Sequence, residues 1–307
     1  MIKKNLIILC YHGVIDDKKK NGIENYSGKH ILKKEFTKQL KFLKKKNCKF
    51  LSLDKVVENI KKKIPFEKNS FCVTFDDGFE NNFTIAAPIL KRLNIPAIFF
   101  LCPKNIDKQQ MFWVDKIEAC INLTSKKKIK IRSLKNNNYN IETNKKKIEI
   151  IKKIKNFCKN NKNHFKNNLI SELIKETKIK PSFKSGYTYK VAKWIAIRKT
   201  LKSKLFTIGG HSLEHDIFTM VSKKNIKKNI SETIKILSKK TNQKIKYFSY
   251  PEGQKKHYNN YVIKILKKNK IVCCPSAING KNSHLDNLFH LKRTMIGFNN
   301  IKLPKLQ

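Results

Sequence analysis

Short apolar runs alternate along the chain with longer segments whose apolar residues recur every three or four positions. The short runs predict buried β-strands and the longer segments predict amphipathic helices, because these spacings match the two side-chain periodicities. The predicted strands cover residues 6–11, 71–75, 96–101, 205–208, 245–250 and 271–274, and the predicted helices cover 31–46, 82–93, 225–237 and 258–266. Strands separated by helices indicate an α/β fold of parallel β/α units, arranged as an open sheet or as a barrel.

The segment from about 122 to 185 interrupts this alternation. It is crowded with Lys and Asn and lacks clear strands, although the Ile-rich part from Ile148 to Phe157 has the spacing of an amphipathic helix. We expect a single domain over 1–307, with a helical, Lys-rich insertion at about 122–185 between the third and fourth strands. Two interpretations of the insertion stay open, a lid that helps to select a substrate and a solvated excursion.

The charge balance is strongly basic. The 307 residues include 69 Lys and Arg against 22 Asp and Glu, which gives a formal net charge of +47, and only four of the basic residues are arginines. Asn and Ile are also abundant, a joint bias typical of an AT-rich coding sequence. A nucleic-acid-binding protein more often uses arginine, which reads guanine and clamps phosphates. We expect a solvated lysine surface and no specific nucleic-acid partner, although such a surface attracts anionic substrates and membrane surfaces.

The apolar runs and the cysteines bear on location. No run approaches the roughly 18 residues of a membrane span, and Leu6 to Cys10 is too short for the core of a secretory signal. None of the eight cysteines forms a CxxC pair, and five lie in or beside apolar runs, where free Cys packs as a small apolar side chain. We expect a cytoplasmic protein in a reduced compartment. The sequence leaves the oligomeric state open.

Three motifs carry candidate chemistry, and each follows a predicted strand. Thr74 to Gly78 (TFDDG) ends a strand with two adjacent carboxylates that point in different directions, so one can bind a metal while the other faces a reacting water. The alternative is a turn, because Asp-Gly is ordinary turn chemistry. Phe248 to Gly253 (FSYPEG) forms either a tight loop whose N–H groups face a pocket or a plain turn.

The remaining motif, Gly209 to His215 (GGHSLEH), places His211 and His215 four residues apart. One helical turn brings such residues onto one face, a spacing suited to two imidazoles on one metal. The acid lies at the wrong position for the zinc-protease motif HExxH. Because β/α folds assemble active sites at the carboxyl ends of strands, one Asp and two His there match a catalytic zinc-type site with a fourth position for water.

The order TFDDG, HSLEH, FSYPEG, preceded by Leu9 to Val14 (LCYHGV), resembles the polysaccharide deacetylases of the NodB-homology type, carbohydrate esterase family 4, in their bacterial cell-surface-glycan branch. The resemblance covers about residues 5–298, apart from the Lys-rich segment. It implies a distorted (β/α)7-type, TIM-like barrel. It also implies a metal-dependent hydrolase that removes acetyl groups from N-acetylated sugars of a glycan or glycan precursor, cleaving a carbon–nitrogen bond that is not a peptide bond. O-deacetylation would use the same residues.

The resemblance also implies roles for individual residues. Asp76 corresponds to the general base that activates water, and Asp77, His211 and His215 to the metal ligands. The backbone N–H of Glu252 corresponds to the oxyanion donor, since Pro251 has none. The metal implied by an Asp/His/His set is by default Zn2+, with Co2+, Ni2+ or Fe2+ as alternatives.

The chain departs from the family pattern in two places, and in each place another residue would have to take over the role. Many members carry an arginine in the third motif, where this chain has Ser249, and we hypothesise that Arg293 approaches Asp76 instead; the alternative is a surface arginine. The general acid is also unassigned: His12, at the end of the first strand, is ranked ahead of His290, although His12 could be purely structural. A catalytically silent glycan-binding module on the same fold is the alternative to the enzyme.

Overall fold

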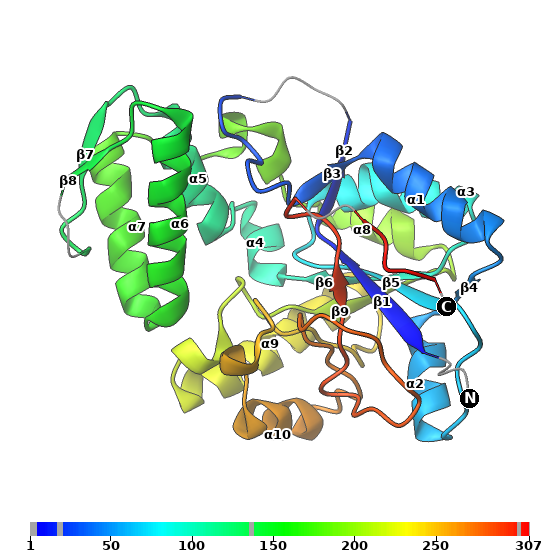
Figure 1. The fold of residues 1–307 in the computed structure, drawn as a ribbon. Coiled ribbons are helices and arrows are strands. Elements are labelled where there is room, and N and C mark those ends of the chain that lie inside the picture. The colour runs from blue at the N-terminus through cyan, green and yellow to red at the C-terminus, as the bar shows by residue number, and fades with distance from the viewer. Residues whose placement is uncertain (1–4, 17–20, 135–137, 300–301, 307) are drawn as a thin grey trace.

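A parallel β-sheet forms the centre of the molecule in the computed structural model, which describes residues 5–16, 21–134, 138–299 and 302–306 (Figure 1). Its strands follow the order β10 (Thr294–Met295), β1 (Leu6–Tyr11), β5 (Ser70–Phe75), β6 (Ala97–Leu101) and β9 (Phe206–Gly210), and β4 (Lys49–Phe50) pairs with β5. All of these pairs are parallel. The predicted α/β class and the first four predicted strands are therefore confirmed.

The last two predicted strands, 245–250 and 271–274, are reduced to single parallel bridges. The bridges pair Gly210 with Phe248 and Tyr247 with Cys273. Each run is followed at once by a proline, Pro251 or Pro275, and proline cannot donate a hydrogen bond to a strand ladder. The prediction of full strands in these two places is wrong.

Irregular backbone beyond these bridges connects the two edge strands of the sheet, β9 and β10. The amide of Cys274 donates to the carbonyl of Leu288 at 3.0 Å, and that of Ser276 donates to Leu291 at 2.8 Å. The chain then enters β10, which pairs with β1. Together with the sheet, these contacts hold the loop after Phe248 close to the residues that follow β5 and β9.

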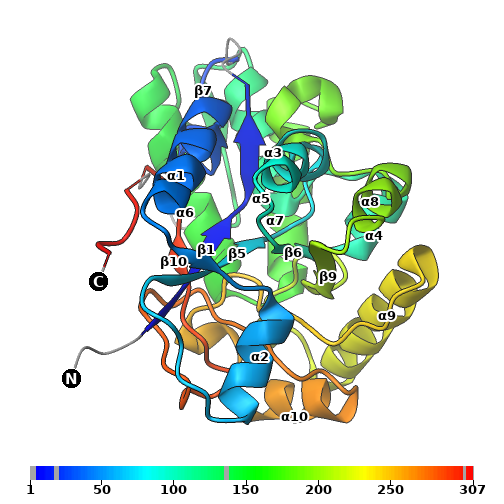
Figure 2. The ribbon, with the colours of Figure 1, turned by 90° about the vertical axis from the view of Figure 1, so that its right-hand side faces the viewer.

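Helices pack on both sides of the sheet. α1 (Lys33–Lys45) and α3 (Ala87–Arg92) lie on one side and α2 (Leu53–Lys61) on the other, as Figure 2 shows. Ile7 and Leu9 of β1 belong to a core shared with α1 and α3, whereas Leu6 and Ile8 belong to a core shared with α2. This alternation is expected of a strand that is buried on both faces.

Three of the four predicted helices are confirmed, as α1, α9 (Lys223–Thr241) and α10 (Asn260–Lys268). The fourth, 82–93, divides into a wider π-helical turn (Asn82–Ala86) followed by α3. Pro88 lies in the first turn of α3, directly after the π-helical turn. Other elements are α4 (Pro103–Lys108), α8 (Trp194–Leu201) and the parallel pair β2 (Gly13–Ile15) and β3 (His30–Leu32).

The described part of 122–185 lies between β6 and β9, and its helices pack on the helix before them around a second apolar core, which also includes Ile23 (green in Figure 1). The segment follows α5 (Trp113–Leu123) and contains β7 (Lys128–Lys130), β8 (Asn138–Asn140), α6 (Asn144–Asn160) and α7 (Asn163–Thr177). The helix predicted at 148–157 is confirmed within α6. The segment also contains two short strands that the sequence did not make clear, since β7 and β8 form an antiparallel pair, each too short to show a period in the sequence.

Among the residues that the structure describes, no helix is both long enough and apolar enough to cross a membrane.

Candidate active site

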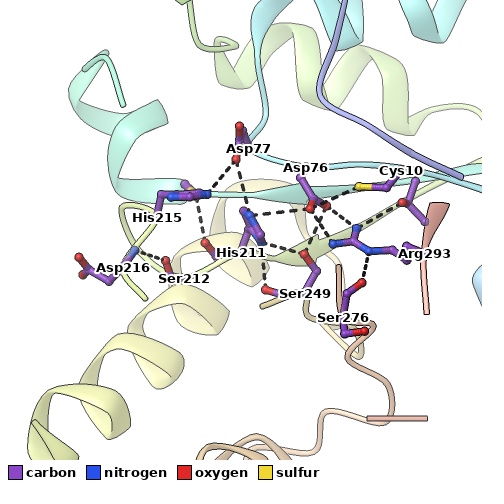
Figure 3. A network of polar contacts seen from close by, with 12 residues as sticks. Cys10, Asp76, Asp77, His211, Ser212, His215, Asp216, Ser249, Ser276 and Arg293 are labelled. Atoms are coloured by element: carbon purple, nitrogen blue, oxygen red, sulfur yellow. Dashed lines mark hydrogen bonds and ion pairs between the residues drawn. The ribbon is translucent and has the colours of Figure 1, made fainter. Parts of the chain in front are cut away.

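The three sequence motifs meet at the carboxyl ends of β5 and β9. The amide of Asp76 donates to the carbonyl of Tyr11 at 3.0 Å, so the parallel ladder between β1 and β5 continues one residue beyond β5. The amide of Ser249 donates to the carbonyl of Gly210 at 2.8 Å, which holds the third motif beside the second. Because the ladders fix the backbone at these points, the side chains of the following residues have set directions (Figure 3).

Asp77, His211 and His215 form a candidate metal centre. All three are buried, and one ligand atom from each lies within 4.8 Å of the others. The Oδ1 atom of Asp77 is 3.6 Å from Nε2 of His211 and 3.5 Å from Nε2 of His215. Asp77 Oδ1 has no hydrogen-bond partner within the described part of the chain, and a buried carboxylate oxygen in that position calls for a cation. The three residues therefore fit a divalent metal.

The protonation and orientation of the two imidazoles also suit a metal. Burial lowers the pKa of His211 and lowers that of His215 still further, so both rings are neutral, which is the ligating form. Nδ1 of His211 lies 2.9 Å from the carbonyl oxygen of Ser249. A donated hydrogen bond there leaves Nε2, the atom that faces Asp77, free to bind.

Asp76 lies beside this centre and pairs with Arg293, the contact that the sequence hypothesis required. Nη1 of Arg293 donates to Oδ1 at 2.7 Å and Nη2 donates to Oδ2 at 2.8 Å, a bidentate geometry. Arg293 is 0% exposed, so the alternative of a surface arginine is wrong. Burial by itself would raise the pKa of Asp76, but the guanidinium of Arg293, together with His211 and His12, holds that pKa below its usual range. Asp76 is therefore an ionised carboxylate.

Ser249 connects the carboxylate to the metal centre. Its hydroxyl donates to Oδ1 of Asp76 at 3.3 Å and lies 2.8 Å from Nδ1 of His211. The thiol of Cys10 makes a further, longer contact with Oδ2 of Asp76 at 3.6 Å. The position where many family members have arginine thus holds a small hydroxyl, while the arginine comes from residue 293, just before β10.

His12 lies close to the motif residues, as expected from its position at the end of the first strand. It is buried and lines the same cavity as Asp76, Asp77 and the two imidazoles. Burial lowers the pKa of His12 to about 3, and its Nδ1 has no partner in the described residues. His290, by contrast, is exposed and pairs with the hydroxyl of Tyr258 at 3.2 Å, away from the cavity lining. The geometry therefore favours His12 over His290.

Glu252 lines the cavity, and its side chain is held by α6. Nζ of Lys159 lies 2.7 Å from Oε2 of Glu252. The helix α7 makes a second contact, between Nζ of Lys166 and Oδ1 of Asp216 at 3.2 Å, directly after His215. The segment 122–185 therefore touches two of the three motif loops, so it is more than a solvated excursion.

The cavity has a volume of about 330 Å³ and contains residues that the sequence motifs did not single out. Lys29 lies over the ring of Phe79 at 4.5 Å and pairs with Asp115 at 2.6 Å. Neither residue belongs to a recognisable motif. Their position follows from packing of the loop before β3 against α5, which no local pattern reports.

The fold and the site together define a parallel α/β protein with a buried Asp-His-His cluster and a neighbouring ionised carboxylate at the carboxyl ends of its strands. The family profile of polysaccharide deacetylases matches residues 63–273, which is more than half of the chain. The chain belongs to the polysaccharide deacetylase family.

Two curated relatives and two solved structures are similar to the chain. The poly-β-1,6-N-acetyl-D-glucosamine N-deacetylase of Staphylococcus aureus is 36% identical over 95 residues, 31% of this chain and 31% of that protein. The protein of the same name from Staphylococcus epidermidis is 37% identical over 84 residues, 27% of this chain and 28% of its own. The chain thus matches less than a third of the length of these relatives.

The similarity of structure extends over nearly the whole chain. The deacetylase PplD of Streptococcus pyogenes, solved with acetate, has a TM-score of 0.61 at 14% identity, over 96% of this chain and 93% of that one. IcaB of Ammonifex degensii has a TM-score of 0.60 at 16% identity, over 95% and 92%. At these identities the similarity shows the fold alone.

Proposed function

We propose that the chain is a metal-dependent deacetylase that hydrolyses the acetamide of an N-acetylated sugar within a glycan or glycan precursor. The observation that carries the proposal is the placement of ionised Asp76 beside the Asp77, His211 and His215 cluster, in a chain of the polysaccharide deacetylase family. The names of the staphylococcal relatives support a poly-N-acetylglucosamine as the substrate class. The active sites of acetamide and acetate-ester hydrolysis are alike, so O-deacetylation belongs to the same proposal.

Asp77, His211 and His215 would hold the cation, for which Zn2+ is the default and Co2+, Ni2+ and Fe2+ are alternatives. When bound, the cation supplies Lewis-acid polarisation of the acetyl carbonyl. We also propose that the fold is a distorted (β/α)7-type barrel in one domain, with 122–185 as an insertion; the contacts between β9 and β10 through residues 248, 273 and 288 support this. A cytoplasmic location stays a prediction.

The chain's own residues supply the proton transfers. Asp76 accepts a proton from the attacking water, while Arg293 and Ser249 keep its carboxylate ionised and oriented. The backbone N–H of Glu252 is the proposed donor to the oxyanion that develops on the acetyl group. The proton that Asp76 accepts can then pass through neutral His12 to the leaving nitrogen, since both residues line the same cavity. The amine and acetate then leave.

The test is metal content and acetate release, measured together on the purified protein with β-1,6-linked N-acetylglucosamine oligosaccharides. About one metal ion per chain and release of acetate support the enzyme. Oligosaccharide binding without acetate release, in the metal-loaded protein, supports the silent glycan-binding module instead.

His12→Gln is expected to lower the turnover of the oligosaccharide by about 10²-fold, the lower part of the range for loss of a general acid. Metal content should not change, since His12 is not one of the three clustered residues. His290→Gln is the matched control and should keep wild-type turnover. Equal turnover in both variants would remove His12 from the mechanism.

A further inference from the structure

Phe298 is a large apolar residue beside the residues of the candidate site. It lines the cavity together with Asp76, Asp77 and His12, yet it is 44% exposed. Its ring stands almost perpendicular to the imidazole of His12, at 89°, with ring centroids 5.1 Å apart. A large apolar ring therefore faces both solvent and the residues that carry the proposed chemistry.

The backbone displays Phe298 in a conformation that bulky residues seldom adopt. Gly297, Phe298 and Asn299 have φ angles of 115°, 53° and 65°. Positive φ at a bulky residue costs free energy, and such residues cluster at ligand sites. Two backbone hydrogen bonds of 2.9 Å maintain the geometry, from the amide of Ile296 to the carbonyl of Cys10 and from the amide of Phe298 to that of Gly28. The fold thus fixes where the ring is presented.

The charges of the cavity favour an uncharged ligand. Five acidic side chains and four lysines line it: Asp76, Asp77, Asp115, Glu118, Glu252, Lys29, Lys152, Lys155 and Lys159. Three of the lysines have acidic partners, in the pairs Lys29–Asp115, Lys155–Glu118 and Lys159–Glu252. A chain with a net charge of +47 therefore presents a nearly balanced cavity. Such a lining suits a neutral ligand rich in hydroxyl groups, because most of its charged side chains already have partners.

We propose that Phe298 is the stacking platform for the N-acetylated sugar ring that enters the cavity. One face of a pyranose ring presents C–H groups that pack on an aromatic face, while its equatorial hydroxyls point sideways toward polar side chains. Phe298 is thus a residue that determines specificity for a sugar, as distinct from a small acetyl compound. The inference rests on the proposed function for the identity of the sugar, but it predicts binding whether or not hydrolysis follows.

The experiment is calorimetric titration of a β-1,6-linked N-acetylglucosamine pentasaccharide into wild type, Phe298→Ala, Phe298→Trp and Phe42→Ala. Phe42 is the matched control, because it is also 44% exposed but lies on α1, outside the cavity lining. Phe298→Ala is expected to raise Kd about tenfold, the upper part of the range for loss of an aromatic contact. Phe298→Trp and Phe42→Ala should bind as wild type does.

Metal content, measured on the same samples, separates loss of sugar binding from damage to the site. In Phe298→Ala it should stay equal to that of wild type, because Phe298 is not part of the Asp77, His211 and His215 cluster. An unchanged pentasaccharide Kd in Phe298→Ala, the same loss in Phe42→Ala, or no binding to wild type overturns the platform. A tenfold loss of binding in a protein that releases no acetate supports the platform and overturns only the hydrolase.

Discussion

Asp76→Asn is expected to lower kcat for acetate release by about 10³-fold, within the range for loss of a general base. An amide cannot accept the proton of the attacking water, whereas the wild-type carboxylate is held ionised by Arg293. Metal content should stay at that of wild type, because Asp76 is not part of the Asp77, His211 and His215 cluster. Acetate release and elemental analysis on the same samples test both statements.

Asp107→Asn is the matched control for this substitution. Asp107 is an exposed carboxylate that pairs with Lys240 at 3.5 Å, so the same chemical change is made away from the cavity. Turnover above about a tenth of wild type in metal-loaded Asp76→Asn would contradict the role of base. Loss of metal together with turnover would show instead that Asp76 holds the cluster together.

The parts of the fold that could be predicted are those set by local sequence. β1 and β6 are continuous apolar runs, β5 and β9 are short and mainly apolar, and α9 repeats its apolar residues at helical spacing. The runs at 245–250 and 271–274 are also mainly apolar. Strand pairing, however, depends on the neighbouring strands and on the prolines that follow, so the apolar pattern predicts longer strands than the structure contains. The pair β7 and β8 is three residues per strand, too short for any period to appear.

The candidate site also has residues whose positions local sequence predicts and residues whose positions it does not. Asp76, Asp77 and His211 lie directly after strands, and the turn that follows β9 places His215 beside them. Arg293 could be proposed because arginine is rare in this chain, although its contact with Asp76 spans 217 positions of sequence. The places of Lys29, Asp115 and Phe298 could not be predicted, because each depends on how one loop packs against a distant element. The contacts of α6 and α7 with Glu252 and Asp216 have the same origin.

Arg293→Met is expected to lower the free energy of unfolding by about 3–5 kcal/mol at pH 7.5, the usual cost of removing one partner of a buried ion pair. The side chain is 0% exposed and also donates from Nε to the carbonyl of Ser276 at 2.7 Å. Methionine fills much of the volume but leaves the Asp76 carboxylate buried without its counter-charge. Denaturant unfolding of the variant and of wild type gives the difference.

The stability lost in Arg293→Met depends on pH, and the ion pair with Asp76 determines whether the loss grows or shrinks as pH falls. In wild type the pKa of Asp76 lies below its usual range, so the stability gained from its ionisation is present above about pH 4 and is lost only as pH falls through the lowered value. Without Arg293, burial dominates and raises the pKa above the unfolded value, so the folded variant favours the protonated acid. The deficit should therefore shrink as pH falls from 7.5 toward 4. The acid limb of kcat/KM should move to higher pH, because the base is protonated earlier.

Arg198→Met, at an exposed arginine, is the matched control and should change stability by less than about 0.5 kcal/mol. The double variant Asp76→Asn/Arg293→Met removes both charges, so it should recover most of the stability that the single Arg293→Met variant loses. A double variant as unstable as the sum of the two single variants would mean that Arg293 stabilises the fold through Ser276 and packing, independently of Asp76. An unshifted acid limb in Arg293→Met would show that the arginine does not control the ionisation of the base. It would also remove that explanation for a buried arginine at this position.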